Sequence, residues 1–146
     1  MSTVLVDDHV LLRILLDDEP DDLRPLGAGL ATTGLWYHRL CRALADQTVV
    51  GSMSRRLGSG DSAMAADVIA AVVDLPDSIE MLTLRTLGWP MAELVRSGIR
   101  LNLLSLEALA AARHLEAEIC LAAADQNRPL LEAAQAQSIP IRQLAS

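Results

Sequence analysis

The chain has 146 residues, of which 51% are hydrophobic and 21% charged, so it can bury a core without disulfides or structural metals. Its formal net charge of −7 argues against a general nucleic-acid-binding module, because phosphate binding depends on lysine and arginine. A nuclease is not excluded, since bound cations would change the local potential.

The cysteines and the absence of long apolar runs indicate where in the cell we expect the protein. Cys41 and Cys120 have no C-x-x-C spacing, so we expect two free, buried thiols in a reducing cytoplasm. The N-terminus carries acids where a signal peptide needs positive charge, and no run of about 18 apolar residues occurs. All 12 basic residues are arginine, a bias that favours a bacterial source. We therefore predict a soluble, cytoplasmic, bacterial protein with no membrane segment.

The first predicted element is a buried strand at residues 4–6. This short apolar run ends in two carboxylates, Asp7 and Asp8, and is typical of a strand in a parallel sheet covered on both faces. Acids just beyond a strand's carboxyl end lie where open α/β sheets bind ligands. We predict that residues 4–6 form the central strand and that Asp7 is the first acid of a metal site. Capping of the next helix is the alternative for Asp7, and Asp8 is expected to be solvated or capping.

The rest of the chain alternates predicted helices with short apolar strands. Helices are expected at 10–16, 35–45, 63–73, 88–97, 106–115 and 129–137, and strands at 30–32, 79–84, 119–122 and 139–141. A helix is the alternative for 79–84, and a polar connector is expected at 51–60. This alternation predicts an α/β fold, a three-layer α/β/α sandwich with a central parallel sheet of four to five strands, in one domain spanning 1–146.

Local signals place the ends of these helices. Thr32 or Thr33 is the expected N-cap of the second helix, and Asp61 that of the third. Pro90 suits the first turn of the helix at 88–97, and Gly98 suits its end. The helix at 106–115 would then have Glu107 in its first turn.

Three acids are predicted to meet at one edge of the sheet. Asp7 and Asp125 follow strands whose carboxyl ends share that edge, and the helix carrying Glu107 begins there. Carboxylate oxygens are the ligands of Mg²⁺ and Mn²⁺. Such an ion would activate a water and neutralise charge on a phosphodiester during hydrolysis. For Glu107 the alternative is a favourable acid near a helix N-terminus, and for Asp125 an N-cap of the helix near Arg128.

The chain resembles the PIN domains, the nuclease fold of VapC-like toxins in bacterial toxin–antitoxin pairs. The resemblance rests on the opening VLVDDHVLL at 4–12, on EALAAA at 107–112 with AAD at 123–125, and on the closing SIPI at 138–141. It implies a Mg²⁺- or Mn²⁺-dependent endoribonuclease with Asp7, Glu107 and Asp125 as metal ligands and catalytic acids. It also implies an RNA substrate, an antitoxin partner and a homodimer.

Four positions depart from the family pattern. Glu107 stands for the usual Asp, Ala123 for a Thr, and His9 for the Ser or Asn after the first acid. Arg39, next to His38, stands where the family has a Glu on the helix after the second strand. A guanidinium cannot ligate a cation, so Arg39 is expected to pair with Asp7, Glu107 and Asp125 in the metal's place, or else to be a surface residue.

These departures leave several hypotheses open. One is an active metal-dependent ribonuclease, and another is a catalytically inactive PIN-like binding or interaction module in which Arg39 replaces the catalytic Glu. An unrelated α/β domain of similar layout is the third. A zinc site at His9 and His38 is a minor alternative. Trp36, Tyr37 and Trp89 are expected to be core or interface anchors rather than base-stacking platforms.

Overall fold

The computed structural model describes residues 2–46 and 62–145, with side chains from residue 66 onward in the second range. The predicted connector at 51–60 and the predicted N-cap Asp61 lie outside the described residues. No helix in the described ranges is long and apolar enough to cross a membrane.

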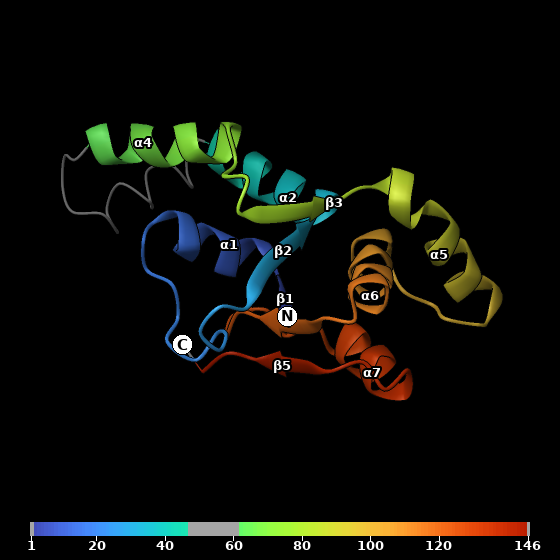
Figure 1. The fold of residues 1–146 in the computed structure, drawn as a ribbon. Helices are drawn as coiled ribbons and strands as arrows, with labels where there is room; N and C mark the ends of the chain where they lie inside the picture. Colours follow the sequence, from blue (N-terminus) through green and yellow to red (C-terminus); the bar gives the residue numbers. More distant parts are fainter. Residues whose placement is uncertain (1, 47–61, 146) are drawn as a thin grey trace.

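A five-stranded parallel sheet forms the middle layer (Figure 1). Its strands are β1 (Thr3–Val6), β2 (Gly29–Thr33), β3 (Ile79–Leu82), β4 (Glu118–Leu121) and β5 (Ile141–Gln143). The order is β3-β2-β1-β4-β5, and every neighbouring pair is parallel. The sheet and the central position of β1 are therefore confirmed. The last strand begins two residues later than predicted, at Ile141. Pro140, just before it, has no N–H to donate, and its carbonyl accepts a hydrogen bond from the Ile119 N–H at 2.9 Å.

Helices cover both faces of the sheet (Figure 1). They are α1 (Asp8–Leu15), α2 (Gly34–Ala45), α4 (Ser62–Val73), α5 (Leu84–Arg96), α6 (Leu103–Leu115) and α7 (Arg128–Ala136). Successive residues of β1 enter opposite cores, because side chains alternate along a strand. Val4 and Val6 pack with residues of α1, α2 and α4, whereas Leu5 packs with residues of α5, α6 and α7. The α/β/α sandwich is confirmed.

Two helices, α5 and α6, begin three or four residues earlier than the sequence predicts, whereas the other starts differ by one or two residues. Helix α5 starts at Leu84, so Pro90 lies inside it rather than in its first turn. Helix α6 starts at Leu103 because Asn102 caps it, accepting the Ser105 N–H at 2.8 Å. Glu107 therefore lies in the second turn of α6. The predicted end of α5 is confirmed, since Gly98 has φ +100° and its N–H bonds the Val95 carbonyl.

The aromatic and cysteine predictions have mixed outcomes. Trp36 is fully buried in the core and Tyr37 is half-buried, donating from its hydroxyl to the Val72 carbonyl at 2.6 Å. Trp89, by contrast, is 73% exposed. Both cysteines are free; Cys120 is buried and Cys41 is half-buried.

Candidate acidic site

Asp7 joins the ends of two neighbouring strands. It follows β1, is fully buried, and caps α1 by accepting the Val10 N–H on Oδ1 at 2.9 Å. Its Oδ2 accepts the N–H of Ala122, just past β4, at 2.9 Å. The capping alternative for Asp7 is therefore confirmed. The hydrogen bond from Ala122 is additional to the cap and ties Asp7 to the end of β4.

Burial sets the protonation of this carboxyl. It raises the pKa of Asp7 from 3.8 to about 6, against the two backbone N–H donors, which lower it. The nearby charges of Asp8 and Asp125 make smaller contributions to the same rise in pKa. Asp7 thus shares its surroundings with two other acids.

Asp8 is buried and paired, so the prediction of a solvated or capping residue is wrong. It is the first residue of α1 and only 5% exposed. Arg39 donates to both of its oxygens, from Nε to Oδ2 at 2.7 Å and from Nη2 to Oδ1 at 2.6 Å. A two-pronged guanidinium–carboxylate pair of this kind combines charge with fixed geometry.

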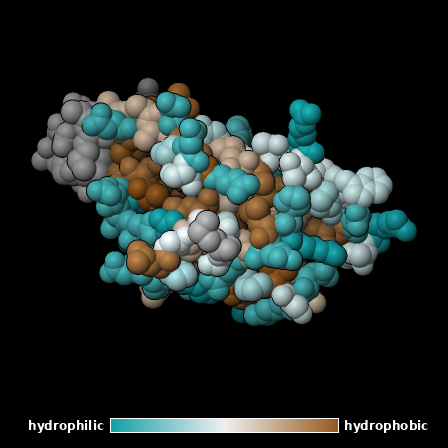
Figure 2. Space-filling model, in the orientation of Figure 1, coloured by the Kyte–Doolittle hydropathy of each residue, from teal (hydrophilic) through white to brown (hydrophobic). Residues whose placement is uncertain are grey.

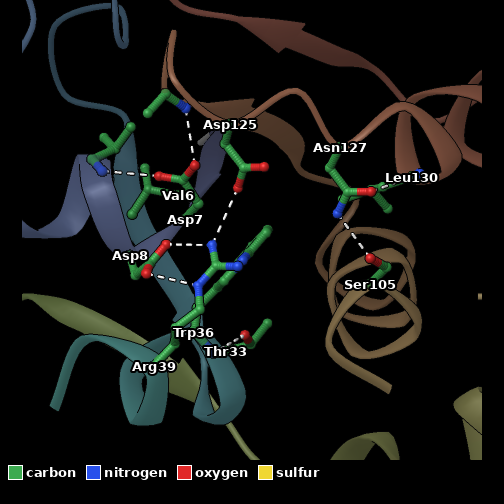
Figure 3. Close-up of polar contacts among 12 residues, drawn as sticks. Val6, Asp7, Asp8, Thr33, Trp36, Arg39, Ser105, Asp125, Asn127 and Leu130 are labelled. Carbon is green, nitrogen blue, oxygen red and sulfur yellow. Dashed lines mark hydrogen bonds and ion pairs between the residues drawn. The ribbon is translucent and has the colours of Figure 1, made fainter. Parts of the chain in front are cut away.

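Arg39 bridges Asp8 to Asp125. Its Nη2 also lies 3.2 Å from Oδ2 of Asp125, in the loop after β4 (Figure 3). The two carboxylates raise the pKa of Arg39, so it stays charged. The prediction that Arg39 enters the crevice is therefore confirmed for Asp125. The predicted pairing with Asp7 and Glu107 is wrong, because Arg39 pairs with Asp8 instead. Both oxygens of Asp7 and Oε1 of Glu107 accept backbone N–H groups.

The resulting acidic group consists of Asp7, Asp8 and Asp125, each offering an oxygen within 4.8 Å of the others. Three carboxylates suit a hard divalent cation such as Mg²⁺ or Mn²⁺. The donor chemistry therefore fits such an ion. The charge balance fits less well, because Arg39 already pairs with two of the three acids.

Glu107 is not a member of this group. It is 1% exposed, and its Oε1 accepts the N–H of Leu35, in the first turn of α2, at 2.8 Å. The N-terminus of a helix carries partial positive charge, which a carboxylate stabilises. A Cβ added at Gly34 would lie 4.0 Å from Glu107 Oε2, so the carboxylate lies close against this turn. Glu107 therefore supports the helix that carries Arg39.

Asp125 does not cap α7, so the capping alternative for it is wrong. Asn127 takes that position, accepting the Leu130 N–H on Oδ1 at 3.2 Å and donating to Ser105 Oγ at 2.8 Å (Figure 3). Gln143 holds the loop that presents Asp125, since its Nε2 donates to the carbonyls of Ala123 at 2.8 Å and Asp125 at 3.1 Å.

The two histidines are not members of the acidic group. His9 and His38 are both exposed, and the one cluster of potential metal ligands in the described ranges contains no histidine. A cavity of about 440 Å³ opens beside Asp125. Its wall is formed by Leu121, Asp125, Gln126, Asn127, Arg128, Leu131 and Gln143.

The residue that sequence reasoning missed is Asp8. Two features of the sequence could have indicated its role. Two acids, Asp7 and Asp8, follow β1, and an arginine, Arg39, stands on α2 where the resemblance implies a carboxylate. A buried carboxylate needs a cationic partner, and Asp8 is the acid of α1 that receives the Arg39 guanidinium from α2.

Comparisons with known proteins support the fold. The chain matches no protein-family model and no curated protein. It is similar to the solved structure of VapBC-1 from nontypeable Haemophilus influenzae, with a TM-score of 0.51 over 98% of each chain at 14% identity. At this identity the likeness supports the α/β fold alone, which the parallel sheet of five strands shows directly.

Proposed function

We propose that this chain is a PIN-like interaction module in which the Arg39 guanidinium replaces the divalent cation of a nuclease centre. The observation that carries the proposal is the pairing of Arg39 with Asp8 at 2.7 and 2.6 Å and with Asp125 at 3.2 Å. One fixed positive charge thereby pairs with two of the three acids. A divalent cation would have to displace a charge-assisted, two-pronged pair to reach Asp8.

A second candidate is a metal-dependent endoribonuclease of the VapC type, which hydrolyses RNA phosphodiester bonds. It is favoured by the closeness of Asp7, Asp8 and Asp125, whose oxygens lie within 4.8 Å. Asp7 and Asp125 of the predicted ligand set, with Asp8 added, would hold Mg²⁺ or Mn²⁺. Glu107, the third predicted ligand, would position α2. The bound ion would supply Lewis-acid activation of water and charge neutralisation at the phosphate.

An antitoxin-like protein is the partner that we propose for the module. The similarity to VapBC-1 supports this class of partner. An apolar groove between α2 and α4 adds to the support, and on the visible face hydrophobic residues gather near α4 and α1 (Figure 2). The groove is formed by Cys41, Leu44, Ala45, Ile69, Val72 and Val73. Burial of such a surface by a partner helix is favourable because it removes apolar area from water.

Calorimetric titration with Mn²⁺ separates the two candidates. We expect no binding to the wild type and none to Asp7→Asn, but binding to Arg39→Gln, which removes the internal cation without adding a charge. The matched control is Arg100→Gln, an exposed arginine outside the acidic group, and it should behave as the wild type. Circular dichroism verifies that each variant is folded.

Other results lead to different conclusions. Binding by the wild type that Asp7→Asn abolishes would favour the nuclease, and it would call for a cleavage assay on 5′-labelled single-stranded RNA with and without EDTA. Absence of binding in every folded variant would refute a cation site at these acids altogether.

A further inference from the structure

The cavity beside Asp125 lies at the carboxyl edge of the sheet and shares only this residue with the acidic group. Its volume of about 440 Å³ is in the range of small-molecule sites, and Leu121 and Leu131 give it an apolar wall. Leu121 ends β4, and Leu131 lies in the first turn of α7. Open α/β sheets bind their ligands in this position, beyond the ends of the strands. The cavity therefore has the place, the size and the lining of a small-molecule site.

Two oxygen acceptors of the cavity wall have no partner within the chain. Asp125 Oδ2 accepts a hydrogen bond from Arg39 Nη2 at 3.2 Å, and Figure 3 shows the other oxygen of Asp125 directed away from Arg39. No donor among the described residues is bound to this second oxygen, Oδ1. Gln143 donates from Nε2 to three backbone carbonyls, while its Oε1 has no partner in the same part of the chain. The cavity thus offers two acceptors, one of them charged.

Arg128 supplies a positive charge to the same cavity. Its side chain is exposed and forms no ion pair or hydrogen bond with any residue that the structure describes. The start of α7 itself offers no free donor, because the N–H groups of residues 128, 130 and 131 already have acceptors and residue 129 is a proline. The guanidinium is therefore the charged anion-binding group, and its planar fork matches a carboxylate.

The local charge favours one class of ligand over another. Asp7, Asp8 and Asp125 can carry three negative charges here, against the two positive charges of Arg39 and Arg128. A phosphate carries up to two further negative charges and would be repelled. A ligand with opposite charges at its two ends is neutral overall, and it can bind Asp125 with one end and Arg128 with the other.

We propose that this cavity binds a zwitterion, namely a free amino acid or a short peptide with an apolar side chain. The ammonium group donates to Asp125 Oδ1 and Gln143 Oε1, and the carboxylate accepts from the Arg128 guanidinium. The apolar side chain covers the two leucines of the wall. The inference does not rest on the proposed function, since it keeps the pair of Arg39 with Asp8 and uses a different surface from the groove between α2 and α4.

Titration of the ¹⁵N-labelled full chain with L-leucine, and separately with L-leucyl-L-leucine, tests the proposal by NMR. We expect amide shifts confined to residues 121–131 and 143, with a dissociation constant of roughly 0.1–1 mM for ligands of this size. The probe that binds more tightly identifies the source, a free amino acid or a peptide. N-acetyl-L-leucine lacks the ammonium group and L-leucinamide lacks the carboxylate, so each should bind roughly tenfold more weakly than L-leucine.

A variant of the cavity gives the sharper measurement. Arg128→Gln should weaken L-leucine binding roughly tenfold but leave L-leucinamide binding unchanged, because only L-leucine has the carboxylate that the guanidinium binds. Arg100→Gln, which removes an exposed arginine outside the cavity, is the matched control and should behave as the wild type. Absence of shifts with both probes at about 20 mM would overturn the proposal. So would L-leucine binding that neither N-acetylation nor Arg128→Gln weakens, or tighter binding of adenosine monophosphate. An unchanged amide spectrum away from the cavity verifies that Arg128→Gln is folded.

Discussion

The Arg39 guanidinium donates a hydrogen bond to each oxygen of Asp8, from Nε to Oδ2 at 2.7 Å and from Nη2 to Oδ1 at 2.6 Å. This pair joins the second turn of α2 to the first residue of α1. The side chain of Asp8 is 7% exposed, whereas that of Arg39 is 40% exposed. Without the arginine, Asp8 would be a buried charge with no cation beside it, whereas Arg39 without Asp8 would still be solvated by water.

Removal of Arg39 should destabilise the protein. In Arg39→Gln the buried Asp8 loses its cation, and breaking a buried pair in this way costs about 3–5 kcal/mol in a dry interior. We expect about 2 kcal/mol here, because Arg39 is partly exposed and water can replace it. Urea denaturation at pH 7 measures the change, with Arg100→Gln as the exposed control. Equal stabilities of the two variants would show that the pair contributes nothing to the fold.

Asp7 should make the stability depend on pH. Between pH about 4 and 6 the folded protein keeps a proton on Asp7 that the unfolded chain releases, since the folded pKa is about 6 rather than 3.8. The free energy of unfolding contributed by this group therefore falls as pH rises through that window, by about 3 kcal/mol at most. Above pH 6 its contribution stays constant. Thermal unfolding of wild type and Asp7→Asn, compared at each pH, isolates the contribution of Asp7. If the stabilities of the two proteins changed with pH in the same way, the prediction would be contradicted.

Glu107 should be intolerant of shortening. Its Oε1 accepts the Leu35 N–H at 2.8 Å, and an aspartate at this position is one methylene too short to reach that donor. We expect Glu107→Asp to cost about 1–3 kcal/mol, the penalty for buried polar groups left unpaired. Glu107→Gln keeps an acceptor and should cost less than Glu107→Asp. Guanidinium denaturation measures both, and the reverse order would exclude this role.

The two cysteines should differ in reactivity. Burial raises the pKa of Cys120 to about 12, so almost none of it is thiolate at pH 8. Cys41 is half-buried and lines the groove between α2 and α4. Native protein treated with iodoacetamide at pH 8 should be alkylated at Cys41 alone, as peptide mass spectrometry would reveal, whereas both should react in urea. Cys41→Ser gives the matched control, and rapid alkylation of Cys120 in that folded variant would contradict its burial.

Much of the fold was predictable from local patterns. The apolar run at 4–6 marks the central strand because β1 is covered on both faces, and Thr33 caps α2 as one of the two predicted candidates. The starts of α5 and α6 were predicted too late. Helix α5 runs through Pro90, and the cap of α6 is Asn102, three residues before Ser105.

The sequence by itself determined the α/β class, the parallel sheet and the place of Asp7 and Asp125 at its carboxyl edge. These follow from hydrophobic periodicity and from the rule that parallel strands end at the same edge. The partners of Arg39 were decided only by tertiary structure. Which of several nearby acids receives a guanidinium depends on how α1, α2 and the loop after β4 pack in three dimensions. In this packing Asp8 receives it, while both oxygens of Asp7 and Oε1 of Glu107 accept backbone N–H groups.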